Sequence, residues 1–116
     1  MAVNPAAEAR PVLVALPAEI DATNARDVRI QIIAAALRPG VRVVIADMTP
    51  TKFCDSMGVR ALLLAHQRAA RSGVELRLLR PGRNVRRVLE LTGADRVLAI
   101  YEGLDEAMMP GPRDMA

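Results

Sequence analysis

The sequence predicts a single α/β domain, with a mixed or mainly parallel sheet of four to five strands and about four helices. Short apolar runs alternate with longer amphipathic segments along the 116 residues. Glycines follow the amphipathic segments, as they do at helix ends. The residues are 52% hydrophobic and 25% charged, which is typical of a globular protein. Alternation of this kind predicts crossover connections between parallel strands.

The first predicted strand covers residues 12–16, where five apolar residues follow one another. The helical pattern after it has Asp21 or Thr23 as its N-cap and Gly40 as its stop signal. Residues 1–10 are polar and rich in alanine, and we expect a short arm or an edge strand there. The domain itself is predicted over residues 11–109.

The second strand, residues 41–48, is an almost unbroken apolar run, which indicates a central strand covered on both faces. Asp47 interrupts this run near its end. A second helix is predicted over residues 56–72 and is closed by Gly73.

The remaining elements alternate in the same way. Residues 74–79 alternate as a strand, and residues 84–93 form a short helical pattern with Gly93 suited to a left-handed stop. A last strand is expected at residues 97–101 and a terminal helix after it. Residues 110–116 have the composition of a loose tail.

The charge pattern favours a solvated surface over nucleic-acid binding. The formal charge of +3 comes from fifteen arginines and one lysine against 13 acidic residues. Only Phe53 and Tyr101 are aromatic, so stacking platforms for bases are missing. A basic nucleic-acid binder remains the less favoured alternative, and it would use the arginine cluster Arg80, Arg83, Arg86 and Arg87.

Cys54 and His66 are the only cysteine and the only histidine. A single cysteine excludes an internal disulfide and a multi-cysteine zinc site. We therefore predict no metal site, a buried structural thiol at Cys54 and a half-buried packing role for His66. The sequence shows no signal peptide and no bilayer-length apolar run, so a cytoplasmic location is expected.

One serine lies where polar strand ends and helix starts should meet. Asp21, Asp47 and the pair Asp55–Ser56 each follow a strand-like run. In a parallel sheet such positions gather at one edge, so we expect three carboxylates around Ser56. Ser56 or Asp55 could simply cap the following helix.

Three chemical roles for Ser56 can be compared. As a hydrolase nucleophile it would need a base, but His66 lies ten residues further on, about 15 Å along the helix axis. For a phosphate-binding loop, the residues around Ser56 lack the required glycines and the lysine. As a phosphate acceptor it would place the new charge at the positive end of a helix dipole. The last role agrees best with the residues.

The second helix carries two apolar stripes. Val59, Leu62, Leu63, His66 and Ala70 have the spacing of a buried stripe. A second stripe is predicted to face solvent beside Ser56 and to dock a partner, or alternatively to widen the core. Its residues, with the neighbouring arginine, are Met57, Arg60, Ala61, Leu64 and Arg68.

The order of motifs from about residue 12 to residue 108 resembles the STAS domain of bacterial anti-sigma factor antagonists. A strand ending in Asp47 is followed by Asp-Ser-x-Gly at residues 55–58, a glycine-led strand, "LRP" and "VLELTG". The resemblance implies a STAS fold with Ser56 as the phosphate acceptor. It also implies that Asp21, Asp47, Asp55 and Gly58 form the neighbourhood of this switch.

The resemblance further implies a regulatory protein and kinase substrate without enzyme activity or cofactor. Its partners would be an anti-sigma factor of the histidine-kinase-like ATPase type, which holds the ATP, and a phosphatase. A monomer or weak dimer is the default. Met57 stands where the family usually has a small residue, and Pro17 and Ala18 also depart from its pattern. The alternative is a STAS scaffold or ATPase-partner subunit without a serine switch, in a stress-signalling assembly or a lipid-transport complex.

Overall fold

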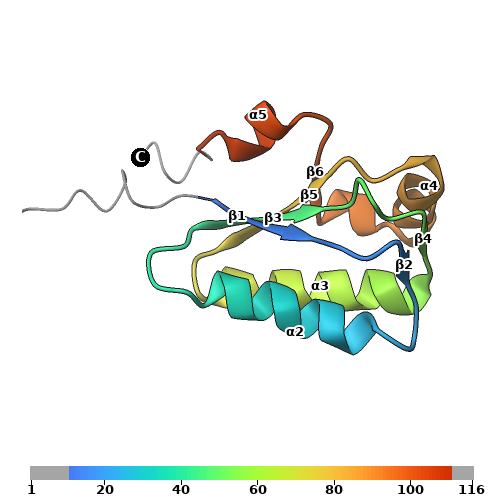
Figure 1. The fold of residues 1–116 in the computed structure, drawn as a ribbon, viewed down its shortest axis with the longest axis horizontal. Helices are drawn as coiled ribbons and strands as arrows, with labels where there is room; N and C mark the ends of the chain where they lie inside the picture. Colours follow the sequence, from blue (N-terminus) through green and yellow to red (C-terminus); the bar gives the residue numbers. More distant parts are fainter. Residues whose placement is uncertain (1–10, 111–116) are drawn as a thin grey trace, which may run out of the picture.

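The computed structural model describes residues 11–110, which form a four-stranded parallel sheet with helices on both faces (Figure 1). The strand order is β1-β3-β5-β6. These strands are β1 (Val12–Ala15), β3 (Val43–Asp47), β5 (Glu75–Leu79) and β6 (Ala99–Tyr101). The helices are α2 (Ala25–Ala36), α3 (Ser56–Arg71), α4 (Arg83–Thr92) and α5 (Leu104–Met108), with a 3₁₀ turn at Ala94–Arg96. The predicted α/β class, parallel sheet and four helices are confirmed.

Helices α2 and α3 lie side by side on one face of the sheet and run in the same direction, while α5 lies on the opposite face (Figure 1). The larger core cluster lies on the side of α2 and α3 and includes Ile32, Val44, Leu62 and Leu78. A smaller cluster of Val43, Ile45, Leu79 and Ala107 lies under α5. Strand β3 contributes to both clusters, so the central strand predicted from its continuous apolar run is confirmed.

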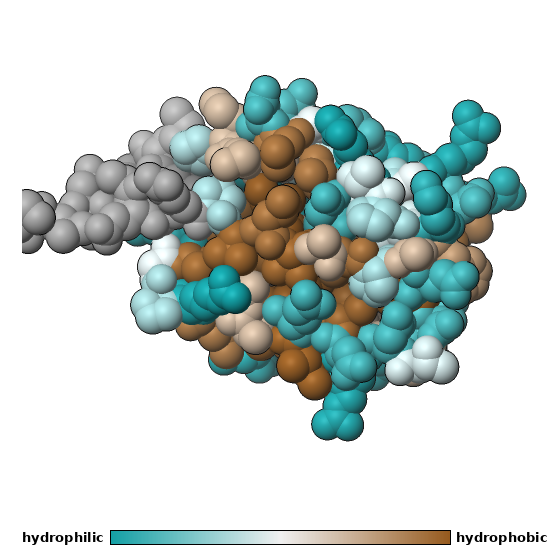
Figure 2. Space-filling model, viewed as in Figure 1, coloured by the Kyte–Doolittle hydropathy of each residue, from teal (hydrophilic) through white to brown (hydrophobic). Residues whose placement is uncertain are grey.

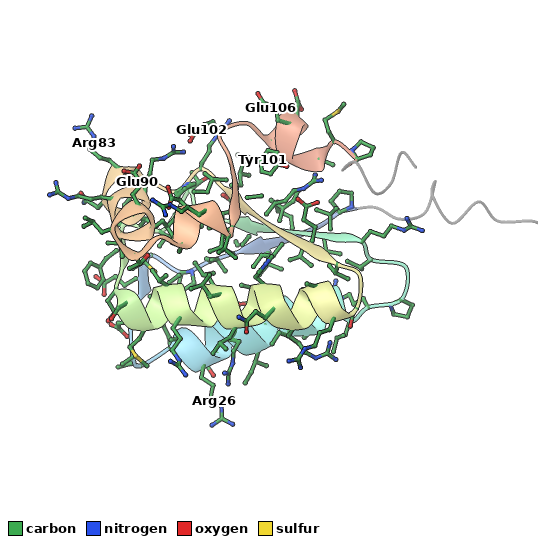
Figure 3. The ribbon with its side chains drawn as sticks, turned by 180° about the vertical axis from the view of Figure 1, so that it is seen from behind. Arg26, Arg83, Glu90, Tyr101, Glu102 and Glu106 are labelled. Atoms are coloured by element: carbon green, nitrogen blue, oxygen red, sulfur yellow. The ribbon has the colours of Figure 1, made fainter. Side chains whose placement is uncertain are left out.

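The far side of β5 holds a buried arginine that the alternating pattern did not predict. Arg77 is only 1% exposed. Its guanidinium donates hydrogen bonds to the carbonyl oxygens of Ala107, at 2.7 Å, and Met109, at 2.5 Å, at the end of α5. It also donates to Glu75 Oε2 at 3.1 Å and lies 5.2 Å from the ring centroid of Tyr101. Arg77 therefore connects α5 to the sheet; Figure 3 shows Tyr101 below that helix.

The start of α2 differs from the prediction. The N-cap is Asn24, and neither Asp21 nor Thr23 caps the helix. Instead, the carboxylate of Asp21 accepts hydrogen bonds from Thr23, which closes a turn before the helix. At the other end, α2 stops at Ala36, and Gly40, with φ +81°, belongs to the following turn. The stops predicted at Gly73 and Gly93 are confirmed, both with positive φ.

The structure also contains a small parallel pair, β2 (Glu19–Ile20) with β4 (Phe53–Cys54). Each strand has two residues, too short to give a periodic pattern in the sequence. This pair packs against the first turn of α3 at Gly58 and so positions the start of that helix.

Apolar side chains gather across the face where β1 lies (Figure 2). Leu13 on that strand is 52% exposed. The predicted arm at residues 1–10 and residues 111–116 of the predicted tail lie outside the described residues. Within residues 11–110, no helix has the length and apolar character to cross a membrane.

Candidate functional site

The β2–β4 pair brings two of the predicted acidic residues together. Ile20 and Cys54 are register partners, so Asp21 and Asp55 leave the pair side by side. The backbone N–H of Asp55 donates to the carbonyl oxygen of Ile20 at 3.1 Å, which extends the pairing by one step. Asp21 and Asp55, which are far apart in the sequence, thus lie at neighbouring strand ends next to the start of α3.

Asp55, and not Ser56, caps α3. Its Oδ1 accepts hydrogen bonds from the backbone N–H groups of Met57, at 2.9 Å, and Gly58, at 3.0 Å. Ser56 is the first residue of the helix and is exposed. Within the described residues its hydroxyl makes no hydrogen bond. The cap therefore leaves the serine hydroxyl accessible at the helix start.

Asp21 is held by local hydrogen bonds. The Thr23 hydroxyl donates to Asp21 Oδ1 at 2.5 Å, and the Thr23 backbone N–H donates at 2.9 Å. These two bonds, the hydroxyl first, lower the pKa of the Asp21 carboxyl below its ordinary value. Asp21 is therefore a fixed negative charge beside Asp55.

Asp47 has a different local role. It ends β3 in the main sheet, and its Oδ1 accepts hydrogen bonds from the Thr49 backbone N–H, at 2.9 Å, and the Thr49 hydroxyl, at 2.6 Å. The buried Thr51 then donates to the Pro17 carbonyl oxygen at 2.9 Å. Asp47 thus shapes the β3–β4 loop.

Gly58 is set by close packing. A Cβ added there would lie 2.5 Å from Cys54 Sγ and 2.8 Å from Ile20 Cγ2. Both neighbours belong to the β2–β4 pair. The missing side chain therefore lets the first turn of α3 sit directly on the strands that carry Asp21 and Asp55.

Gly58→Ala is expected to destabilise the fold by about 1–3 kcal/mol, because overpacking outweighs the helix propensity gained from alanine. Urea denaturation measures the change. Combining the substitution with Cys54→Ala removes one of the two clashing atoms. The double variant should therefore lose less stability than the sum of the single variants; strict additivity would contradict the packing explanation.

Two exposed apolar side chains flank the serine. Met57 is 47% exposed, and Phe53 on β4 is 51% exposed. Met57 was predicted to lie here, whereas the exposed Phe53 was not singled out from the sequence. No sequence signal marks it, because β4 has only two residues and shows no periodic pattern.

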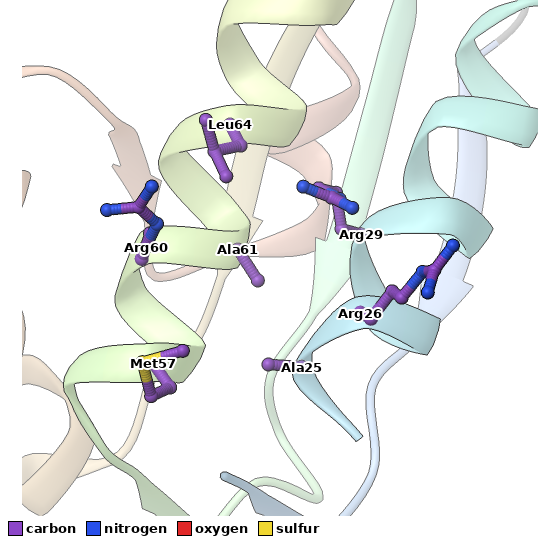
Figure 4. A pocket seen from close by; sticks show the side chains of 7 residues that line it. All are labelled: Ala25, Arg26, Arg29, Met57, Arg60, Ala61 and Leu64. Atoms are coloured by element: carbon purple, nitrogen blue, oxygen red, sulfur yellow. The ribbon is translucent and has the colours of Figure 1, made fainter. Parts of the chain in front are cut away.

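The predicted docking residues on α3 form one wall of a pocket with α2 (Figure 4). The pocket has a volume of about 130 Å³. Met57, Arg60, Ala61 and Leu64 line it from α3, and Ala25, Arg26 and Arg29 line it from α2. Arg68 lines a second pocket further along the helices. The residues from α2 were missed, because the sequence does not show which helix lies beside α3.

The predicted exposure of Ala61 is wrong. Ala61 is only 5% exposed, because α2 packs against it. The buried side of α3 is centred on Val59, Leu62, Ala65 and Ala69. Leu63 and His66 are only partly buried, and Ala70 is exposed.

Neither Cys54 nor the predicted basic cluster forms a site of its own. Cys54 is buried; burial, and then the charge of Asp55, raises the pKa of its thiol to about 11, so it stays protonated. No group of three potential metal ligands occurs in the part of the chain that the structure describes. Glu102 receives a hydrogen bond from Arg80 through its carbonyl oxygen and forms an ion pair with Arg86. Arg80 and Arg86 are therefore engaged by Glu102, whereas Arg83 points outward (Figure 3).

Comparisons with known proteins agree with this architecture. The family model of the STAS domain matches residues 3–107, and no curated protein matches the sequence significantly. The unphosphorylated anti-sigma factor antagonist SpoIIAA is 24% identical, with a TM-score of 0.70 over 85% of both chains. An anti-sigma factor antagonist from Mycobacterium paratuberculosis is 25% identical, with a TM-score of 0.68 over 82% of this chain and 80% of that one.

The same fold also occurs in a different class of protein. A sulfate transporter family protein from Wolinella succinogenes is 16% identical, with a TM-score of 0.69 over 84% of this chain and 81% of that one. Because such remote likeness shows the fold alone, the role of this chain depends on its own residues.

Proposed function

Because the chain belongs to the STAS domain family, we propose that it is an anti-sigma factor antagonist regulated by phosphorylation of Ser56. One observation carries the proposal: Ser56 is exposed at the first position of α3, with its hydroxyl unengaged among residues 11–110. A kinase can reach such a hydroxyl without unfolding the domain.

The surroundings of Ser56 suit an electrostatic switch. Asp55 already accepts the hydrogen bonds of Met57 N–H and Gly58 N–H. A phosphate on Ser56 would therefore not be neutralised by those two amides, and it would add a charge of roughly −1.5 to −2 beside Asp21 and Asp55. A partner docked on this edge would meet a new, strongly hydrated group.

The proposed partner is an anti-sigma factor that is also a histidine-kinase-like ATPase. In its unphosphorylated form the chain would bind this partner and release the sigma factor; phosphorylation would end the binding, and a phosphatase would restore it. ATP would belong to the kinase alone. SpoIIAA, which has been solved in a phosphorylated form as well, is the relative that supports this cycle; that form is 23% identical, with a TM-score of 0.62.

Intact mass spectrometry of the protein from its own cells tests the acceptor. We expect a mass increase of one phosphate that phosphatase removes and that Ser56→Ala abolishes. Ser72→Ala is the matched control, because Ser72 is the only other serine and lies at the opposite end of α3. If the protein is unmodified under both growth and stress, the phosphorylation switch is contradicted and a constitutive scaffold becomes the better interpretation.

A further inference from the structure

A long groove runs between α2 and α3, away from Ser56. Its near part is the pocket of about 130 Å³ described above, and its far part has a volume of about 320 Å³. Arg29 and Leu64 line both parts, so the two parts adjoin along the helices. The apolar lining consists of Ala25, Ile30, Ile33, Met57, Ala61 and Leu64.

Both walls of this groove are basic. Arg26 and Arg29 stand on α2, and Arg60, Arg68 and Arg71 stand on α3. Figure 4 shows Arg29 reaching from α2 toward Leu64, with Arg26 and Arg60 at the outer sides. No acidic residue of the described chain lines either part.

These arginines are not neutralised within the described chain. No carboxylate in residues 11–110 forms an ion pair with Arg26, Arg29, Arg60 or Arg71. Arg68 donates only to the Ser72 hydroxyl, at 2.8 Å. Five cationic side chains around an apolar floor leave a charge that a ligand would have to complement.

We infer that the groove binds an acidic amphipathic helix of a protein partner. Apolar residues at helical spacing would fill the floor, and flanking Asp and Glu side chains would meet the arginines. From Met57 to Arg71 the groove follows fifteen residues of α3, and the fourteen steps between them span about 21 Å, or roughly four helical turns of a partner.

The lining favours a protein helix over a nucleic acid. The groove has no aromatic side chain for base stacking, and its floor is apolar. A helix with one apolar face and two acidic edges satisfies both properties of the groove at once.

This inference rests on the proposed function, since it specifies what the docking partner presents beside Ser56. Ser56 and Arg60 are four positions apart on α3 (i and i+4), so they share one helix face. A phosphate on Ser56 would lie near the basic wall and would compete with the acidic edge of the partner helix.

A selection from a displayed library of 15-residue helices tests the inference. All members carry the same apolar stripe of Leu and Met, and the flanking positions vary among Asp, Glu, Lys, Arg, Gln and Ser. Against the wild-type protein we expect acidic flanks to be enriched over basic flanks by about tenfold or more, as electrostatic complementarity requires. Enrichment of neutral or basic flanks, or no enrichment, would overturn the inference.

The double variant Arg29→Glu/Arg60→Glu should lose or reverse the acidic preference. Arg83→Glu/Arg87→Glu is the matched control, because it makes the same charge change on exposed residues of α4. Far-ultraviolet circular dichroism confirms that both variants fold. An equal loss of the acidic preference in the two variants would show that net charge causes it, and would overturn the inference that the groove binds the helix.

The outcome is separable from that of the phosphorylation experiment. Enrichment of acidic helices without any modification of Ser56 would support the groove as a binding site and contradict the phosphorylation switch. Phosphorylation of Ser56 without enrichment of acidic helices would support the switch and contradict the groove as a binding site. The selected helices are also tested for binding to the protein saturated with duplex DNA. Unchanged affinity would support a groove site distinct from the α4 arginines. Competition between DNA and the helices would count against a groove specific for a protein helix.

Discussion

Arg77→Ala is expected to lower the free energy of unfolding by about 3 kcal/mol, combining lost charged hydrogen bonds with a cavity in the core. The guanidinium holds the carbonyl oxygens of Ala107 and Met109 and stacks on Tyr101, so its loss should release α5 from the sheet. Urea denaturation measures the change in stability. Amide hydrogen exchange should show faster exchange at Ala107 before any change at Leu62 in α3.

Two controls separate the hydrogen bonds from the packing. Arg77→Met keeps most of the volume and should lose less stability than Arg77→Ala, while still weakening the protection of α5. Arg71→Ala removes an exposed arginine and should change stability by less than about 0.5 kcal/mol. A loss below about 1 kcal/mol for Arg77→Ala would show that α5 is held by its apolar contacts alone.

Arg77 also shows where sequence reasoning reached its limit for the fold. The alternation of apolar runs and amphipathic segments predicted every main-sheet strand and all four helices, because periodicity reports local burial directly. An arginine in a strand is normally exposed, so the pattern gave no sign that a short terminal helix would cover it. Its burial depends on α5, a contact across some thirty residues of chain.

The site was predictable in part for the same reason. Ser56 and Asp55 follow one another at a helix start, so their neighbourhood could be read locally. Asp21 joins them through a two-residue strand pair that has no periodic signal. Asp47 was grouped with them because it also ends a strand. That strand is β3 of the main sheet, and the Asp47 carboxylate accepts a hydrogen bond from Thr49 in the following loop.

The residues of the proposed docking surface could not all be predicted from the pattern of one helix. The spacing on α3 identified Met57, Arg60 and Leu64, but it placed Ala61 in solvent. Only the neighbouring position of α2 explains why Ala61 is buried and why arginines occur on both walls. Helix adjacency is a tertiary property, and the apolar sector of α3 alone is compatible with several neighbours.

Ser56→Asp is expected to weaken binding to the kinase-type anti-sigma factor by about tenfold or more, which corresponds to about 1.4 kcal/mol. The new carboxylate would stand beside Asp21 and Asp55 and would lose hydration on docking. Ser56→Ala should bind like the unphosphorylated protein and remain bound when ATP is added. Isothermal titration calorimetry with and without ATP measures both variants.

Asn84→Asp provides the matched control, because it adds one carboxylate to the exposed first turn of another helix, α4. If position matters, this variant should retain its affinity while Ser56→Asp loses it. The difference between the two should shrink as salt is raised, since the screening length falls from about 8 Å at physiological ionic strength to about 3 Å at 1 M salt. Equal affinity of Ser56→Asp and Ser56→Ala would remove the switch. A difference that persists at high salt would show that lost hydration or steric exclusion at Ser56, and not repulsion between the carboxylates, causes the loss of affinity, because those two effects are not screened.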